Sequence, residues 1–226
     1  MFEATTEPDP TFNNLMMVDL RATRHYLFRG FSGRHAAARL LLSHAERELR
    51  VVVADPTERT AIGGRARYLM RHQNADADID YESVHSRLHE EIRIGLVGLY
   101  LARNRCSRID LSVVADPPLD RVEMFDDSVW ISLYSDVGGN STLYPRTLRF
   151  SEGSFIYNME RAELTRIANG HGARHASISP DTTRREFVDL YHHITGARLS
   201  AAEFTALEER FHTFRREFSA AADIGS

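Results

Sequence analysis

A repeated two-residue alternation between residues 121 and 133 constrains the fold more than any other feature of the chain. Residues 121–125 alternate polar and apolar side chains, and Val129, Ile131 and Leu133 alternate again after an acidic pair at residues 126–127. Successive side chains of a strand point to opposite faces of a sheet. The pattern therefore predicts two antiparallel strands joined by a tight acidic turn.

Strand and helix patterns also succeed one another before the hairpin. Residues 15–22 are apolar enough for a buried strand, residues 35–49 repeat apolar side chains at helical spacing, and residues 51–53 form the next strand. Ser32 is the expected N-cap of the first helix. A strand, helix, strand order predicts a right-handed crossover between parallel strands, and hence an α/β fold.

Further helices are expected on both sides of the hairpin. Residues 57–73 are helical in pattern with an interruption at residues 63–64, and a polar linker over residues 74–80 separates them from the longest helix, residues 81–103. The apolar stripe of the longest helix should pack on the sheet; it consists of Val84, Leu88, Ile92, Leu96 and Leu99. After the hairpin, residues 147–150 predict a short strand and residues 155–168 another helix.

The composition shifts near residue 170, and the chain divides there. We expect a frayed tail over residues 1–14, an α/β domain over residues 15–170, and a C-terminal two-helix appendage over residues 171–226. One appended helix begins near Ser179, and the other follows a capping box at residues 200–203. The last helix carries an apolar stripe that must be buried on the sheet, as a lid or in a dimer: Phe204, Leu207, Phe211, Phe214 and Phe218.

Several segments, in this order, resemble the phospholipase D-like fold, particularly the phospholipase D-like domains fused to helix-turn-helix regulators in high-GC bacteria. The matching segments are a strand ending in Asp55 and Pro56, the run 108–111 after a long helix, the hairpin 121–127, Pro145, and residues 154–157. The resemblance covers residues 15–170, which is one half of the usual two-half enzyme. It implies a mixed sheet flanked by helices. For a single half it also implies a homodimer that recreates the two-half arrangement.

The catalytic signature of that family is a His, any residue, a Lys, four more residues and an Asp. Aligned on Asp126, the histidine position holds Leu119 and the lysine position holds Arg121. Leucine cannot be a nucleophile, so the residue that attacks phosphorus has no counterpart here. The resemblance therefore implies a fold without its standard chemistry, in which Arg121 could hold an anion and Asp126 could orient it.

Composition excludes several classes of function. The 226 residues can bury one substantial core, and a formal net charge of −4 argues against a nucleic-acid-binding domain, which is usually basic. The single cysteine cannot form an internal disulfide, no apolar run approaches the ~20 residues of a membrane span, and no signal-peptide pattern is present, so we expect a cytoplasmic protein. All 28 basic residues are arginine, which excludes Schiff-base lysines and lysine-containing phosphate loops.

Two segments are candidate anion sites. In residues 29–34, glycines and arginines precede a helix, and free amides with guanidiniums suit phosphate or carboxylate; the alternative is an ordinary capped turn. The second segment is the hairpin, for which a surface turn is the alternative. The expected ligand-binding residues are Arg29, Ser32, Gly33, Arg34, Arg121, Asp126 and Asn140. His85 and His89 have metal-compatible spacing without a third ligand nearby, so we expect no metal and no other cofactor.

Two functions remain open. The first is a ligand-binding or regulatory module that holds an anionic small molecule, namely a phosphate, nucleotide or carboxylate, and the missing nucleophile favours it. The second is an enzyme that reuses the same cleft for acid–base chemistry on phosphoryl or acyl groups. Its candidate catalytic residues are Asp126, Glu123 and His35, with His25 as the alternative histidine.

Overall fold

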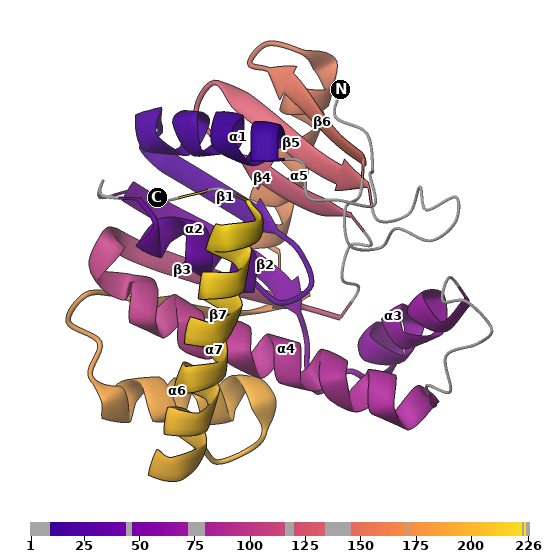
Figure 1. Ribbon diagram of the computed structural model, residues 1–226, viewed down its shortest axis with the longest axis vertical. Coiled ribbons are helices and arrows are strands. Elements are labelled where there is room, and N and C mark those ends of the chain that lie inside the picture. The colour runs from indigo at the N-terminus through magenta and orange to yellow at the C-terminus, as the bar shows by residue number, and fades with distance from the viewer. Residues whose placement is uncertain are drawn as a thin grey trace.

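The structure is a computed structural model of an α/β protein built on one mixed sheet of seven strands (Figure 1). It describes residues 10–43, 47–71, 80–115, 120–133, 146–170, 172–222 and 224. The strand order is β6-β5-β4-β1-β2-β3-β7. The strands are β1 (His25–Arg29), β2 (Arg47–Ala54), β3 (Cys106–Val114), β4 (Arg121–Met124), β5 (Ser128–Leu133), β6 (Arg146–Ser151) and β7 (Ala173–Ile178).

Three central strands are parallel and the outer strands are antiparallel to their neighbours. β1 pairs with β2 and β2 with β3 in parallel, while β4, β5, β6 and β7 each join the sheet in the antiparallel sense. The helices are α1 (Pro10–Ala22), α2 (Arg34–Leu41), α3 (Arg59–Arg71), α4 (Tyr81–Ala102), α5 (Phe155–Ala168), α6 (Arg184–Thr195) and α7 (Ala201–Ala221), with a short 3₁₀ turn at Arg103–Arg105. The predicted α/β class and the central hairpin are confirmed.

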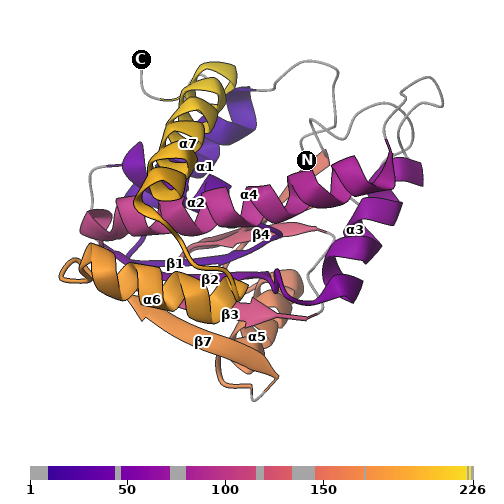
Figure 2. The same ribbon diagram turned by 90° about the horizontal axis from the view of Figure 1, so that it is seen from below.

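The two faces of the sheet are covered unequally. Helices α1, α2, α4 and α7 stack over one face, with α6 beside α4, whereas α5 lies on the other face (Figures 1 and 2). The larger core lies on the many-helix side. The smaller core lies under α5 and contains Val52, Val122, Met124, Val129, Tyr157 and Leu164. We call these the helix-covered face and the α5 face.

The predicted strand over residues 15–22 is wrong, because this segment is part of α1. Met16, Met17 and Leu20 are buried while Leu15 and Val18 are exposed, which is a helical rather than a two-residue pattern. The helix begins at Pro10, so the expected tail over residues 1–14 is helical from there on. Ser128, Trp130 and Arg149 all donate to the Asp19 carboxylate, which attaches α1 to β5 and β6.

Other boundaries also differ from the sequence prediction. α2 ends at Leu41, and the residues from Arg47 already belong to β2, so the helix expected over residues 35–49 is shorter. α3 continues through Gly63 and Gly64 without the expected break. The helices expected over residues 81–103 and 155–168 are confirmed within one residue.

The chain after residue 170 begins with a strand of the sheet. β7 pairs with β3 along its length before the chain turns into α6 and α7, so the last 50 or so residues share the main sheet and core. α6 begins at Arg184 behind a Thr183 cap rather than near Ser179. The capping box of Ser200 and Glu203 is confirmed, and Phe204 and Phe211 are buried against the rest of the core.

Candidate functional site

A small cavity lies at the carboxyl end of β1. Because β4 runs antiparallel to β1, with Arg29 opposite Val122, the turn that follows β1 meets the residues that begin β4. The cavity has a volume of about 90 Å³. It is lined by Phe28, Gly30, Phe31, Ser32, Arg34, His35, Arg65, Glu91, Asp120 and Arg121. The structure thus brings together two segments that the sequence had offered as separate candidates, and we call this space the arginine cavity.

The turn beside the arginine cavity depends on close packing against α4. Its last residue, Gly33, has φ 70° and is the N-cap of α2, so the predicted Ser32 cap is wrong. No side chain of the described residues caps this helix. A Cβ atom at Gly95 of α4 would lie 1.7 Å from the Ser32 carbonyl oxygen. Glycine at position 95 therefore lets the helix backbone contact the turn directly.

An ion cluster lies behind the arginine cavity and is almost fully buried. Glu123 Oε1 is 3.1 Å from Arg121 Nε, and Glu123 Oε2 is 3.0 Å from Arg39 Nε. The Tyr26 hydroxyl donates to the same carboxylate at 2.5 Å. The side chains of Arg39 and Glu123 are 0% and 1% exposed. Two guanidiniums thus contact one carboxylate in a region that is almost fully buried, where each charge depends on its partner.

Arg34 completes the positive surroundings from the rim of the cavity. Its Nη2 atom is 3.4 Å from Glu91 Oε1, and its guanidinium lies 4.6 Å from the centre of the Phe214 ring. With Arg65 on α3, three arginines line the cavity, together with the carboxylates of Glu91 and Asp120.

His35 lies close to three of these arginines. Its buried ring packs edge-on against Phe214 and Phe218, with ring centres 5.1 and 5.5 Å away. Burial lowers the pKa of His35 well below 6.5, and the nearby Arg121, Arg34 and Arg39 lower it further. The imidazole is therefore neutral near pH 7, and the charges around it are positive.

Several residues that the sequence placed in one cleft lie elsewhere. Arg29 points to the α5 face, where its Nη2 atom is 2.8 Å from Glu160 Oε2. Asp126 lies beyond the opposite end of β4 from Arg121, so it cannot orient an anion held by that guanidinium. Asn140 lies outside the described residues. Glu123 lies behind the cavity, where it forms ion pairs with Arg39 and Arg121.

The alternative histidine, His25, forms a pair with Asp126 on the α5 face. The His25 Nδ1 and Asp126 Oδ1 atoms are 2.9 Å apart, and the Arg24 amide donates to the other carboxylate oxygen at 2.7 Å. Burial raises the pKa of Asp126, but these hydrogen bonds, with one from Thr23, outweigh burial and hold the pKa below its usual value. The pair lines a groove of about 450 Å³ with Tyr157 of α5.

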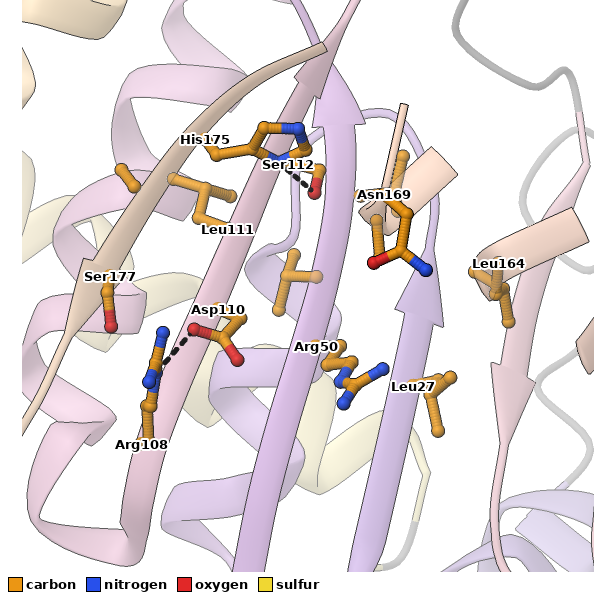
Figure 3. A pocket seen from close by; sticks show the side chains of 14 residues that line it. Leu27, Arg50, Arg108, Asp110, Leu111, Ser112, Leu164, Asn169, His175 and Ser177 are labelled. Carbon is orange, nitrogen blue, oxygen red and sulfur yellow. Dashed lines mark hydrogen bonds and ion pairs between the residues drawn. The ribbon is translucent and has the colours of Figure 1, made fainter. Parts of the chain in front are cut away.

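A second cavity on the α5 face was not anticipated from the sequence. It has a volume of about 430 Å³ and lies between α5 and strands β2, β3 and β7 (Figure 3). Ser112 Oγ and His175 Nδ1 are 3.1 Å apart across β3 and β7, and His175 Nε2 is 3.1 Å from the Gly170 carbonyl oxygen. Arg108, Asp110 and Ser112 alternate along the sequence, which could have indicated a polar strand face. The strand that carries His175 was not predicted, so the pair could not be found.

The remaining chemistry candidates do not form sites. His85 and His89 have ring centres 4.8 Å apart, and no group of three His, Cys, Asp or Glu side chains able to hold a metal ion occurs in the described part of the chain. Cys106 is buried, and burial raises the pKa of its thiol to about 12, so it is a thiol rather than a thiolate. Of the described helices, none has the length and apolar character needed to cross a membrane.

Comparison with known proteins adds no relative to this picture. No family model, no curated protein and no solved structure matches the chain. The phospholipase D-like resemblance therefore stays a prediction, and the function has to be argued from the geometry of the two cavities.

Proposed function

We propose that this chain is a ligand-binding module of a regulatory kind, which holds the phosphate or carboxylate group of a small molecule in the arginine cavity. The convergence of three arginine side chains, those of Arg34, Arg65 and Arg121, on one small cavity is the observation that carries the proposal. Arg34 and Arg121 reach the cavity from two elements far apart in sequence, and buried Arg39 adds its charge from behind. Guanidiniums of this kind form charge-assisted hydrogen bonds with phosphate or carboxylate oxygens.

The size of the cavity defines which part of the ligand it can hold. About 90 Å³ accommodates a few water molecules or one anionic group, whereas sites for whole drug-sized ligands usually span ~300–1,000 Å³. The remainder of the ligand then lies outside the cavity. A nucleotide would be held by its terminal phosphate, and a carboxylic acid by its carboxylate.

The residues that replace the family signature support binding rather than the family's catalysis. Arg121 occupies the position of the signature lysine and retains its charge, and Leu119 occupies the position of the nucleophilic histidine. A guanidinium donates paired hydrogen bonds to phosphate or carboxylate oxygens, but it does not act as a general acid near neutral pH, because it does not lose its proton there. The positive charge retained at position 121 therefore favours a binding role.

Isothermal titration with inorganic phosphate, pyrophosphate, succinate and acetate tests the proposal. Substituting Arg34→Gln removes a charge-assisted hydrogen bond of about 1.5–3 kcal/mol, which corresponds to about a 10- to 100-fold rise in Kd. Arg50→Gln is the matched control, because it removes the same charge from the α5 face. If none of the anions binds to the wild-type protein at millimolar concentration, or both variants bind equally well, the arginine cavity is not an anion site.

We also propose a homodimer, as expected for a single phospholipase D-like half. Among the described residues, four large apolar side chains are exposed, two on α1 and two on α5: Leu15, Val18, Phe155 and Met159. Phe155 is 78% exposed, and apolar surface of this kind on a helix is suited to a protein contact. Sedimentation velocity at micromolar concentration should show a dimer that Phe155→Ser weakens. A monodisperse wild-type monomer would contradict this arrangement.

A further inference from the structure

The cavity in Figure 3 lies on the α5 face, on the opposite side of the sheet from the arginine cavity. Ser112 and His175 face each other in it because β3 and β7 are antiparallel and pair these two residues directly. Both side chains point to the same face at the closest positions of neighbouring strands. The Ser112 hydroxyl is thus held at hydrogen-bond distance, 3.1 Å, from one imidazole nitrogen.

A third group fixes the protonation of the imidazole. His175 Nε2 is 3.1 Å from the carbonyl oxygen of Gly170, and a carbonyl oxygen can only accept a hydrogen bond. In neutral His175 the proton is therefore on Nε2, which leaves the lone pair of Nδ1 to accept the hydroxyl proton of Ser112. A hydroxyl, an adjacent base and a group that orients the base are the parts of an activated serine.

Hydrogen-bond donors also face this cavity. The Arg50 side chain enters it from β2, and the Asn169 carboxamide enters it from the end of α5 (Figure 3). Arg50 lies two residues before Val52, which is the register partner of Ser112, so both side chains point to the α5 face. Donors of this kind can stabilise negative charge on the oxygen of a tetrahedral intermediate.

We propose that Ser112 and His175 form the nucleophile and the base of an acyl-transfer site for small esters or thioesters. Ser112 Oγ attacks the carbonyl carbon while its proton passes to His175 Nδ1, and Arg50 and Asn169 donate to the carbonyl oxygen as it becomes negative. The imidazolium returns the proton to the leaving alkoxide or thiolate as the bond between it and the carbonyl carbon breaks. Water, deprotonated by His175, then hydrolyses the acyl-serine and releases the acid.

The site is independent of the proposed anion binding. The sheet separates the two cavities, and the residues that line one do not line the other. Acyl transfer here can fail while the arginine cavity binds its anion, and the reverse also holds.

Labelling with a fluorophosphonate reagent tests the proposal directly. The serine oxygen displaces fluoride, so one phosphonyl adduct should appear by intact-protein mass spectrometry and map to Ser112. His175→Gln keeps a hydrogen-bonding side chain but removes the base, and labelling should become about a hundredfold slower or more. Ser112→Ala should abolish the adduct. Ser177→Ala is the matched control, because Ser177 lines the same cavity two residues from His175, and it should label like wild type.

Hydrolysis of p-nitrophenyl acetate gives a second readout in the same set of proteins. Release of p-nitrophenol should require Ser112 and His175 and should be unchanged in Ser177→Ala. Thermal unfolding of each variant checks that the fold is retained, and mapping the adduct on the wild-type protein does not depend on any variant. An unlabelled wild-type protein, an adduct on another serine, or His175→Gln labelling at the wild-type rate would overturn the proposal.

Discussion

Two arginine–carboxylate pairs on opposite faces of the sheet show how strongly the surroundings determine the role of an ion pair. On the helix-covered face, Arg39 Nε and Glu123 Oε2 are 3.0 Å apart and both side chains are buried. On the α5 face, Arg108 Nε and Asp110 Oδ1 are closer, at 2.6 Å, but their side chains are 62% and 41% exposed. The shorter contact is the weaker constraint on the fold, because water screens the exposed pair and the buried charges depend on each other.

The largest expected effect comes from the same charge change made on each face. Glu123→Gln leaves two guanidiniums without their shared carboxylate in a dry region, and we expect a loss of about 3–5 kcal/mol in the free energy of unfolding. Asp110→Asn removes an exposed partner and should cost at most about 1 kcal/mol. Urea denaturation of both variants measures the difference. Equal losses would show that water reaches the cluster around Glu123.

A smaller difference is expected between two helical glycines. A Cβ atom at Gly95 would overlap the Ser32 carbonyl oxygen, and the backbone atoms on both sides have to move, so Gly95→Ala should cost about 1–3 kcal/mol or more. At Gly64 a Cβ atom would have no neighbour within 4 Å. Gly64→Ala should therefore stabilise the protein, by about 0.4–1 kcal/mol, because alanine favours helices.

Denaturation midpoints of these two variants should move in opposite directions. If Gly95→Ala also weakens phosphate binding in proportion to its effect on the turn, the close packing of α4 shapes the arginine cavity as well as the core. A Gly95→Ala protein as stable as wild type would mean that the turn and α4 can separate without cost.

A pH dependence of stability is expected from one buried histidine of the helix-covered face, His35. The pKa of His35 is lower in the folded protein than in the unfolded chain, so the unfolded chain binds the proton first as the pH falls. The stability that neutral His35 contributes is complete above about pH 6.5 and decreases below it, by at most about 1.4 kcal/mol per pH unit. His35→Phe keeps an aromatic ring between Phe214 and Phe218 and should flatten the change in unfolding free energy between pH 7 and pH 5. An unchanged slope would place His35 in contact with water.

The elements with strong local signals were predictable from the sequence. The hairpin alternates along β4 and β5, the stripe from Val84 to Leu99 runs along most of α4, and the capping box at Ser200 marks the start of α7. In each case one short-range rule was sufficient, and the packing of the whole protein agreed with it.

The errors occurred where a local pattern was short or where distant contacts decided the outcome. Residues 15–22 are too few for an apolar run to distinguish a strand from a helix, and the burial of Met16, Met17 and Leu20 on one side settles the matter. β7 is a short edge strand, and the composition shift near residue 170 was interpreted as the end of the α/β domain rather than as the approach to another strand.

The candidate site was predictable in part for the same reason. Arg34 and Arg121 were both identified, but only the antiparallel pairing of β1 with β4 shows that they share a cavity. Arg29 points to the opposite face of the sheet from Arg121 and pairs with Glu160. Which face a strand residue points to depends on the register of the strand. Ser112 and His175 are 63 residues apart and meet only through pairing of β3 with β7, so no sequence motif joins them.

The position of β7 at the edge of the sheet links the cavity of Figure 3 to the C-terminal helices. Arg174 and His175 are neighbours on β7 and point to opposite faces. His175 faces Ser112, whereas Arg174 donates to Asp55 and to the carbonyl oxygens of His193 and Ile194 at the end of α6. A displacement of α6 would therefore pull on the strand that carries the imidazole. An edge strand pairs with one neighbour only, so the contacts of Arg174 with α6 give β7 a second attachment to the rest of the protein.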